Sequence, residues 1–307
     1  MASPILKWAG GKRQLLDELY DRFPHSYDHF HEPFFGGGAL FFELEPKNGS
    51  INDTNPRLIN FYKQVRDNPE KLISRLRSFE EPESSPDPNL PFAESNRKGK
   101  EIKNYYYQQR EIFNNRPYGN KFDELDEAAR LLYLNRTCYN GLYRENGDGG
   151  FNVPIGRYSN PDWIRANKIR EASRVLESTE IYNRDFEYIS EIVTSGDLVY
   201  FDPPYEPMSP TASFNDYSQD GFGREDQERL LKLALELDRE GINVILSNSG
   251  VMYEMYNDAG FYVKKEGATR AINSDGSNRD KVNEIIATNV VPANRQDAGQ
   301  QGLADFS

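Results

Sequence analysis

An acidic residue, two prolines and a tyrosine end an apolar run of the chain, Asp197-Leu198-Val199-Tyr200-Phe201-Asp202-Pro203-Pro204-Tyr205. The run predicts a buried strand, and two prolines stop it at once because proline cannot donate to a sheet. Ligands of open α/β sheets bind outside the carboxyl ends of the strands, so we expect Asp202 and Tyr205 at the ligand edge. The alternative is an ordinary strand end followed by a Pro-Pro turn.

The chemistry that suits these residues is activation of a weakly nucleophilic amino group on a base, such as that of adenine. Its lone pair is delocalised into the ring. The Asp202 carboxylate and the Pro203 main-chain carbonyl could accept both amino hydrogens and favour a tetrahedral, nucleophilic nitrogen. Tyr205 would stack on the extruded base, which contributes about 1–3 kcal/mol. We therefore expect the catalytic residues to be Asp202, Pro203, Pro204 and Tyr205.

A glycine-rich turn and an aspartate suggest a nucleotide-like ligand. The turn Phe34-Phe35-Gly36-Gly37-Gly38 leads from an expected strand into a helix, and glycines there let the backbone approach a ligand. A nicotinamide-binding fingerprint needs another glycine at position 41, where Phe41 stands, which disfavours a dehydrogenase. Asp53 ends the next short strand and is placed to take ribose hydroxyls, or to form a turn or helix cap.

A phosphate-binding loop is excluded at Gly10-Gly11-Lys12. Leu6 stands where its first glycine would be, and Arg13 replaces the hydroxyl residue that would hold magnesium. The sequence predicts no metal site, because His25, His29 and His31 lack a strong ligand spacing.

In their order along the chain, several blocks resemble the Dam-type (D12 class) DNA adenine-N6 methyltransferases, whose catalytic motif is Asp-Pro-Pro-Tyr. The resemblance covers nearly the whole chain. The blocks are Lys7–Lys12, Glu32–Phe41, Asn52–Asn55, Asn140–Arg144, Phe151–Tyr158, Asp185-Phe186 and the Asp202 motif.

The resemblance implies S-adenosylmethionine as cofactor and assigns its contacts. In the family the region of Trp8 and Lys12 contacts the cofactor, with Lys12 suited to a carboxylate, and Asp185-Phe186 lies near the cofactor's adenine. A buried anchor is the alternative for Trp8, and a helix cap for Asp185. The expected cofactor residues are Trp8, Ala9, Gly10, Lys12, Phe34, Gly36, Gly38, Asp53, Asp185, Phe186 and Asp202.

The same resemblance predicts double-stranded DNA as the partner. In family members that recognise GATC, the segment similar to Asn140–Tyr158 of this chain reads the site, so we expect GATC here. Hydrogen bonds to base edges need side chains that enter the major groove, and arginine is the commonest reader of guanine. The expected recognition residues are Arg110, Asn140, Leu142, Arg144, Pro154 and Arg157. Further candidates, for phosphate contacts, are Arg116, Arg136, Arg270, Arg279 and Lys281. Each arginine could instead be solvated or paired with a local acid.

Short strand-like runs alternate with helical stretches along the chain. This alternation predicts a mostly parallel α/β sheet, which the resemblance makes one of the Rossmann-like methyltransferase type. The runs are 51–53, 181–183, 198–201 and 244–247. We expect a discontinuous catalytic domain at 1–60 and 161–290. Residues 61–160 form an inserted, mostly helical target-recognition subdomain, carrying a β-hairpin over 140–153. Further expectations are helical patterns at 72–76 and 128–134, an amphipathic helix at 225–237, an exposed loop at 80–91 and a disordered tail at 291–307.

The composition argues partly against DNA. The 307 residues carry a formal net charge of −12, whereas nucleic-acid affinity comes from lysine and arginine, and members of the resembling family are generally less acidic. The acidic surface and the low mean hydropathy suggest a high-salt cytoplasm. The single cysteine, Cys138, excludes a disulfide framework and a cysteine-rich zinc site and is expected to pack in the core. No apolar run resembles a signal peptide or a membrane span, so we expect a cytoplasmic monomer without membrane partners.

Two other functions stay open at this point. An amino methyltransferase acting on cytosine-N4, RNA or protein glutamine would share the strand-end chemistry, although such enzymes usually have serine or asparagine in place of Asp202. A catalytically silent DNA-binding module is the third possibility. The sequence does not decide between a partner of a restriction nuclease and an orphan methylase.

Overall fold

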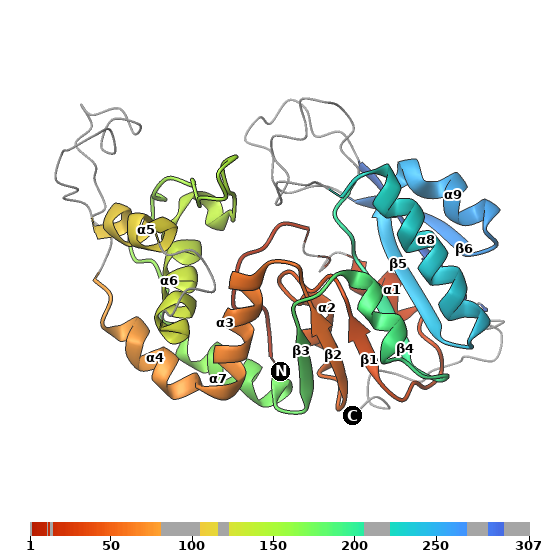
Figure 1. Ribbon diagram of the computed structural model, residues 1–307, viewed down its shortest axis with the longest axis horizontal. Helices are drawn as coiled ribbons and strands as arrows, with labels where there is room; N and C mark the ends of the chain where they lie inside the picture. Colours follow the sequence, from red (N-terminus) through yellow and green to blue (C-terminus); the bar gives the residue numbers. More distant parts are fainter. Residues whose placement is uncertain are drawn as a thin grey trace.

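A seven-stranded sheet forms the half of the molecule on the right of Figure 1, and a group of helices forms the other half. The computed structural model describes residues 2–10, 12, 15–80, 105–115, 123–205, 222–268 and 282–291. The strands are β1 (Phe30–Glu32), β2 (Gly49–Asn52), β3 (Thr179–Tyr182), β4 (Leu198–Phe201), β5 (Asn243–Ser249), β6 (Tyr262–Ala268) and β7 (Val282–Thr288).

The order of the strands is β3-β2-β1-β4-β5-β7-β6. Strands β1 to β5 pair in parallel, and β7 pairs antiparallel with both β5 and β6. The chain moves outward from β1 to β3 and then returns to the other side of β1 as β4. This reversal places a topological switch point at the carboxyl ends of β1 and β4, where open α/β sheets bind ligands. The expected mostly parallel, Rossmann-like sheet is confirmed.

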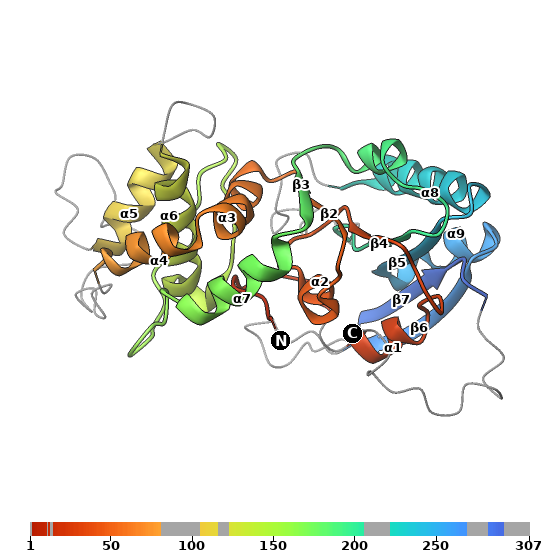
Figure 2. The ribbon, with the colours of Figure 1, turned by 90° about the horizontal axis from the view of Figure 1, so that it is seen from below.

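Alternate side chains of the central strands face the two sides of the sheet, as the two-residue period of a strand requires. Val199 and Phe201 pack in the cluster beneath α8 (Arg224–Arg239), whereas Leu198 and Tyr200 belong to the other core cluster. Figure 2 shows α8 on one face of the sheet, and α1 (Leu16–Tyr20) and α2 (Ala39–Leu44) on the other. Short helices η3 (Phe186–Glu191), η5 (Gly250–Met252) and α9 (Tyr253–Asp258) complete this half.

The helical half is built from α3 (Pro56–Asp67), α4 (Pro69–Arg77), α5 (Tyr105–Asn115), α6 (Glu124–Thr137) and α7 (Ala166–Leu176). The side chain of Asn55 caps α3 by accepting from the amides of Arg57 and Leu58, and Asp123 caps α6 in the same way. Buried side chains of α3, α4 and α6 pack in one cluster, which also takes up Cys138. The predicted packing role of Cys138 is therefore confirmed.

The expected strands and helices within the described residues form close to their predicted positions. The amphipathic helix is α8, with Leu230, Leu233, Ala234 and Leu237 buried and Leu231 partly buried. Residues 81–91 and 292–307, which cover the expected exposed loop and tail, lie outside the described residues, as do Arg116, Arg270, Arg279 and Lys281.

The expected hairpin at 140–153 forms only in part. Its first residues are a short helix, η2 (Tyr139–Gly141), and its arms share a single antiparallel bridge between Glu145 and Phe151. Backbone bonds from the Asn152 amide to the Arg144 carbonyl at 3.0 Å and from the Asn146 amide to the Gly150 carbonyl at 2.8 Å also join the arms, and α5 binds the outer edge of the second arm. Asn114 bonds both the amide and the carbonyl of Phe151, each at 2.9 Å, and the Tyr106 hydroxyl donates to the Val153 carbonyl at 2.8 Å.

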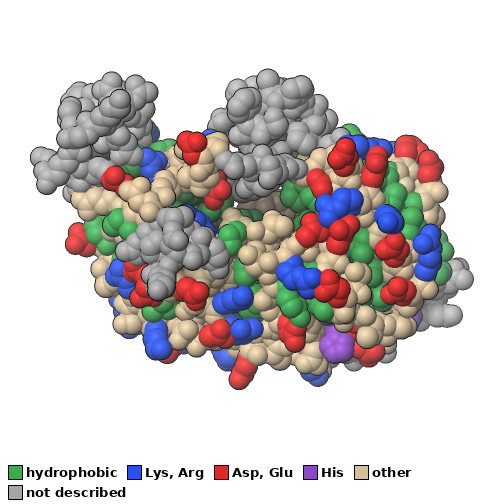
Figure 3. Space-filling model, in the orientation of Figure 1, with side chains coloured by type: hydrophobic (Ala, Val, Ile, Leu, Met, Phe, Trp, Pro, Cys, Tyr) green, Lys and Arg blue, Asp and Glu red, His purple; other side chains and the backbone are tan. Residues whose placement is uncertain are grey.

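Acidic and basic side chains lie side by side on the face shown in Figure 3, particularly over α8. Pairs along this helix include Arg224 with Glu228 at 3.2 Å and Arg229 with Asp226 at 2.9 Å. No described helix is long and apolar enough to cross a bilayer.

Candidate active site

Asp202 directly follows β4 at the topological switch point. Its side chain is 19% exposed, and Pro203 behind it is buried, whereas Pro204 is exposed. Tyr205 is partly buried beside it. The strand-end position predicted for the four catalytic candidates is the observed one.

The ammonium group of Lys12 lies within this turn. Its Nζ is 3.1 Å from Asp202 Oδ1, donates a hydrogen bond to the Tyr205 hydroxyl and lies 4.4 Å from the centre of the tyrosine ring. A third partner is Glu284 of β7, whose Oε1 is 3.9 Å away. Glu284 reaches this edge because β7 runs antiparallel and pairs it with Ser249 at the end of β5.

The carboxyl group of Asp202 titrates above its ordinary range. Burial raises its pKa from 3.8 to about 6, Lys12 opposes the rise, and the negative charge of Glu284 adds to it. The group is therefore ionised at neutral pH and can accept hydrogen bonds from a substrate amino group.

A second carboxyl group, Glu32 at the end of β1, was not among the predicted site residues. It is 3% exposed, and its Oε2 has no hydrogen-bond partner among the described residues. Burial, together with the nearby charge of Asp202, raises its pKa well above the usual value. One oxygen of this carboxyl group is bonded to the Phe41 backbone, and a cationic ligand beside the other, unpaired oxygen would stabilise the ionised form. The available signal was its place before the glycine-rich turn, at a strand end.

The glycine-rich turn lies against Trp8. Gly36 has a φ of 49°, and a Cβ on it would come within 2.8 Å of the Trp8 ring, so glycine is required there. The Trp8 indole also stacks on Tyr143 at 5.0 Å between centroids. Trp8 is thus a packing anchor at the site. Ala9 and Gly10 form the turn that leads from it to Lys12.

Asp53 follows β2 and supports the same turn. Its Oδ2 accepts from the Gly36 amide at 3.0 Å, and its Oδ1 accepts from the Asn55 amide at 2.9 Å. Burial raises the pKa of Asp53, although the two amides oppose the rise. The carboxylate therefore lies at the sheet edge and also forms the turn before α3. Gly38, at the start of α2, is buried.

Asp185 and Phe186 follow β3. The Asp185 carboxylate caps η3 through the Glu187 amide and pairs with Arg229 of α8 at 3.0 Å, so the capping alternative describes its contacts. Phe186 is buried and stacks on Phe34 at 5.4 Å between centroids.

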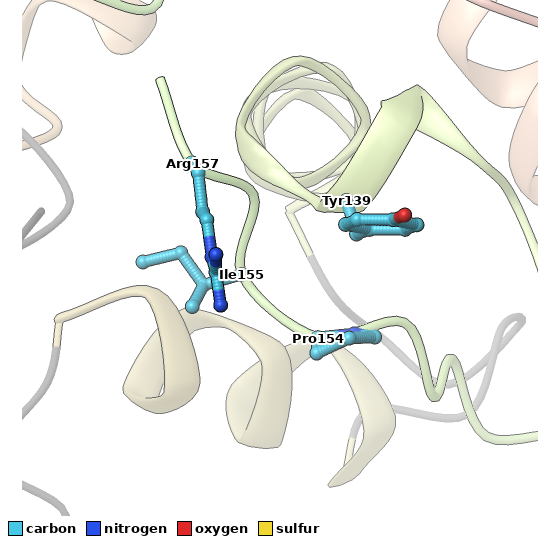
Figure 4. Close-up of a pocket in the computed structure, with 4 residues that line it drawn as sticks. All are labelled: Tyr139, Pro154, Ile155 and Arg157. Atoms are coloured by element: carbon cyan, nitrogen blue, oxygen red, sulfur yellow. The ribbon is translucent and has the colours of Figure 1, made fainter. Parts of the chain in front are cut away.

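The predicted recognition residues gather in the helical half. Tyr139, Asn140 and Arg157 are exposed, and Leu142, Arg144 and Pro154 are partly buried. A hollow of about 400 Å³ is lined by Tyr139, Pro154, Ile155 and Arg157. Figure 4 shows the rings of Tyr139 and Pro154 on one side of it and Arg157 on the other. Tyr139, which is 44% exposed, was not predicted, because an exposed aromatic residue leaves no periodic signal.

Three arginines of this region already have protein partners. Arg144 Nε donates to Asn152 Oδ1 at 2.7 Å, and Arg110 Nη1 donates to the Val153 carbonyl at 3.1 Å. Arg136, a candidate phosphate contact, donates to the Asp162 carbonyl at 3.4 Å.

Lys7 and Asn135 join the recognition segment to the turn that carries Lys12. The Asn135 side chain of α6 accepts from the Lys7 amide at 2.9 Å and donates to the Lys7 carbonyl at 2.8 Å. It also donates to the Gly141 carbonyl at 3.1 Å. A side chain on Gly141 would collide with the aliphatic part of Lys7.

The sheet edge as a whole suits a cationic, nucleotide-like ligand. Two carboxyl groups, those of Asp202 and Glu284, flank the ammonium group of Lys12, and the buried Glu32 lies close enough to Asp202 for their charges to interact. A sulfonium with an amino acid ammonium group and a ribose would meet carboxylates at Glu32 and Asp53 and open backbone at the glycine-rich turn. The described residues contain no group of three or more histidine, cysteine or acidic side chains that could hold a metal ion.

Comparison with protein families gives a match over residues 8–272. The matching family is the D12 class N6 adenine-specific DNA methyltransferases.

Curated relatives are similar over nearly their whole length. The Type II methyltransferase M1.LlaDCHI of Lactococcus lactis subsp. cremoris is 43% identical over 93% of this chain and 95% of its own. The Type II methyltransferase M.MjaIII of Methanocaldococcus jannaschii is 39% identical over 93% and 98%. The DNA adenine methylase of Escherichia coli K12 is 34% identical over 92% and 94%.

Proposed function

Because the chain belongs to the D12 class N6 adenine-specific DNA methyltransferases, we propose that the turn Asp202–Tyr205 activates the adenine it methylates. The enzyme transfers a methyl group from S-adenosylmethionine to N6 of adenine in DNA, which decides against the other amino methyltransferases and the silent module. The observation that carries the proposal is the position of Asp202, at the end of β4 and within 3.1 Å of Lys12.

The mechanism starts with an adenine flipped out of the duplex. The Asp202 carboxylate accepts one N6 hydrogen, and the Pro203 carbonyl accepts the other, so that the nitrogen lone pair is localised. The Tyr205 ring stacks on the base and orients it. S-adenosylmethionine, when bound, would supply an electrophilic methyl group on a sulfonium. Transfer is direct: as N6 takes the methyl group the carbon–sulfur bond breaks, the sulfur leaves as a neutral thioether, and one N6 proton is lost through Asp202 to solvent. Cys138, buried in the core, takes no part.

Residues at the carboxyl edge hold the cofactor. Glu32 would accept from the cofactor's ammonium group at its buried Oε2, which has no partner among the described residues. Asp53 would take the ribose hydroxyls beside the turn of Phe34 to Gly38, and Asp185 and Phe186 would hold the adenine. Lys12 would bind the cofactor's carboxylate with its ammonium group still beside Asp202.

Residues 61–160 act as the target-recognition subdomain, and residues 1–60 and 161–290 as the catalytic domain. Arg144, Leu142, Asn140, Pro154 and Arg157 read the base edges of double-stranded DNA, and Arg110 supports the recognition segment through Val153. The resemblance of this segment to GATC readers favours GATC as the site. The enzyme acts as a cytoplasmic monomer, either beside a restriction nuclease or as an orphan methylase.

Methylation of plasmid DNA tests the recognition site. Adenines methylated by the purified enzyme are mapped, and we expect them within GATC. A different consensus would refute GATC and leave the adenine chemistry intact.

The substitution Asp202→Ala tests the chemistry. It removes one of the two hydrogen acceptors, so we expect methyl transfer to be abolished while DNA binding stays largely intact. Transfer of labelled methyl groups and DNA binding are measured together. Near-normal turnover would refute the role of Asp202.

A further inference from the structure

The catalytic turn is held from behind by a fully buried amide side chain. Gln227, in the second turn of α8, has an exposed fraction of 0%, and its Nε2 donates to the Pro204 carbonyl at 3.3 Å. Neither Pro203 nor Pro204 has a backbone N–H, so these two residues cannot anchor the turn as donors. A side-chain donor to one of their carbonyls replaces that missing anchor.

A second buried amide fixes the first. Asn248 of β5 is also 0% exposed, and its Nδ2 donates to Gln227 Oε1 at 2.8 Å and to the Tyr256 hydroxyl at 3.1 Å. Asn248 Oδ1 accepts from the Ser249 amide at 2.8 Å. The chain of contacts thus runs from the core of the sheet to the Pro204 carbonyl.

The two end groups of this series of hydrogen bonds, the Ser249 amide and the Pro204 carbonyl, determine the orientation of both side-chain amides. A backbone N–H can only donate, so the oxygen of Asn248 must face Ser249 and its nitrogen must face Gln227. The oxygen of Gln227 therefore faces Asn248. Its nitrogen faces the Pro204 carbonyl, which can only accept. Each of these contacts pairs a donor with an acceptor, and flipping either amide would break a contact at each end.

We propose that Gln227, oriented by Asn248, is a positioning residue that holds the Asp202–Tyr205 turn in the geometry needed for methyl transfer. The proposal rests on the proposed function. Gln227 touches no reacting atom, because its contact is with Pro204. The two acceptors for the N6 hydrogens, Asp202 and the Pro203 carbonyl, lie immediately before that contact. Displacing reacting groups by about 1 Å can lower a rate by about 100-fold, so a loose turn would slow the chemical step.

The substitution Gln227→Glu gives the decisive readout. A glutamate can still accept from Asn248, but when ionised it has no hydrogen to donate and repels the Pro204 carbonyl. When protonated, its O–H faces the carbonyl and restores the contact. Burial raises the pKa of a carboxyl group from about 4.3 into a measurable range. We expect kcat to approach the wild-type value at acid pH and to fall about 10- to 100-fold below it at alkaline pH.

The pH readout depends on comparing each variant with the wild type at the same pH. The Tyr256 hydroxyl, which faces Asn248, has its pKa raised to about 12 by burial, and it stays protonated throughout. Asp202 lies in the turn itself and titrates in both enzymes. Asp226 and Arg229 flank the position on α8 and are paired with each other. The ratio of the two kcat values therefore follows the introduced glutamate.

Two further variants complete the test. Gln227→Met has nearly the same shape without hydrogen bonds or charge, and we expect a reduced kcat with a ratio to wild type that does not change with pH. Asn289→Asp is the matched control, because Asn289 is an amide that bonds Asp238 and the Ile242 carbonyl at the amino end of β5. We expect it to lower the melting temperature and to leave kcat unchanged.

A wild-type kcat in Gln227→Met overturns the proposal, even if Gln227→Glu fails to fold. The proposal is also overturned if kcat of Gln227→Glu is reduced by the same factor relative to wild type at every pH. Such a defect would come from altered packing and not from the lost hydrogen bond. KM for S-adenosylmethionine and DNA affinity should stay within about twofold, since the change acts on the chemical step. If the wild type methylates adenine and the variants are unaffected, only the role of Gln227 is refuted. If the wild type does not methylate adenine, the proposed function is refuted as well.

Discussion

In the proposed mechanism, the protonation state of Asp202 governs whether the catalytic turn can accept a hydrogen bond from adenine. Its pKa of about 6 is set by burial, by the Lys12 ammonium and by the Glu284 carboxylate. Only the ionised form accepts, so the single-turnover rate with saturating cofactor should rise with pH through this pKa and then level off.

The two charged neighbours should move this midpoint in opposite directions. Lys12→Met removes the cation that stabilises the carboxylate and shifts the midpoint to higher pH. Glu284→Gln removes a like charge and shifts it to lower pH. Rates are measured across the pH range for wild type and both variants. Shifts of the same sign in the two variants would rule out this electrostatic arrangement.

At the residue scale, the sequence predicts those side chains whose neighbours along the chain carry a signal. Asp202 and Tyr205 follow an apolar run, and Asp53 ends a short strand. Glu284 and Gln227 carry no such signal. They meet the turn only because β7 and α8 fold back onto it, from positions 82 and 25 residues after Asp202. Contacts of that kind depend on the sheet order, which no local pattern contains.

At the scale of elements, the start of α8 joins two parts of the site. Gln227 bonds the catalytic turn, and Arg229, two residues on, pairs with Asp185 at 3.0 Å and lies 4.9 Å from the Phe186 ring. One helix thus supports both the reacting groups and the proposed adenine side of the cofactor site. A shift of α8 would disturb the two together.

Asp197 joins the amino ends of β1 and β4. It lies at the edge of the sheet opposite the carboxyl edge that carries the site. Its Oδ1 lies 2.8 Å from His29 Nδ1, and its Oδ2 accepts from the Thr194 amide at 2.8 Å. Burial alone would raise the pKa of Asp197, but the bonds from Thr194 and His29 outweigh it, and the pKa is lowered below 3.8.

Asp197→Asn should therefore destabilise the fold at neutral pH by about 1–3 kcal/mol, because a charged acceptor in a buried network is lost. A lowered folded-state pKa gives stability that is complete above the unfolded pKa and lost as the pH falls through the folded one. The difference in free energy of unfolding between wild type and variant should therefore shrink at pH values below 3.8, the ordinary pKa of an aspartate. Urea unfolding at several pH values measures it, and a constant difference into strong acid would contradict this linkage.

The elements were predictable where burial is strongest. Strand β4 is buried at all four positions, and its predicted bounds are the observed ones. The hairpin was less predictable because Asn114, Tyr106 and Arg110 of α5 bind its second arm. These side chains, 37 to 47 residues away, bind the outer edge of that arm, and no local turn signal contains such contacts.

At the scale of the whole molecule, the N-terminal segment connects the two halves. Lys7 is bonded to Asn135 of α6, Trp8 stacks on Tyr143 of the recognition segment, and Lys12 reaches Asp202. Within six positions of the chain, Lys7 and Trp8 therefore contact the helical half and Lys12 contacts the catalytic turn. The proposed base readout and base activation are joined by this short segment.

The net charge of −12 sets the conditions under which this molecule meets DNA. Phosphates and an acidic surface repel each other over a Debye length, which is about 30 Å at 0.01 M salt and about 3 Å at 1 M. Salt also weakens direct lysine and arginine contacts to phosphate, which lowers affinity in ordinary DNA-binding proteins. Screening of the repulsion should raise DNA affinity, whereas weakening of the phosphate contacts should lower it. The acidic composition favours the screening effect.

We therefore expect kcat/KM for DNA to rise as potassium chloride increases from low to molar concentration. Sucrose at matched osmolality is the control, because it leaves charge interactions unscreened and should not raise the rate. The melting temperature, followed in the same series, separates screening of the DNA encounter from stabilisation of the fold. An enzyme that is fastest in dilute buffer and slows steadily with salt would show that counterion release at phosphate contacts outweighs the repulsion, and that the acidic surface is no adaptation to high salt.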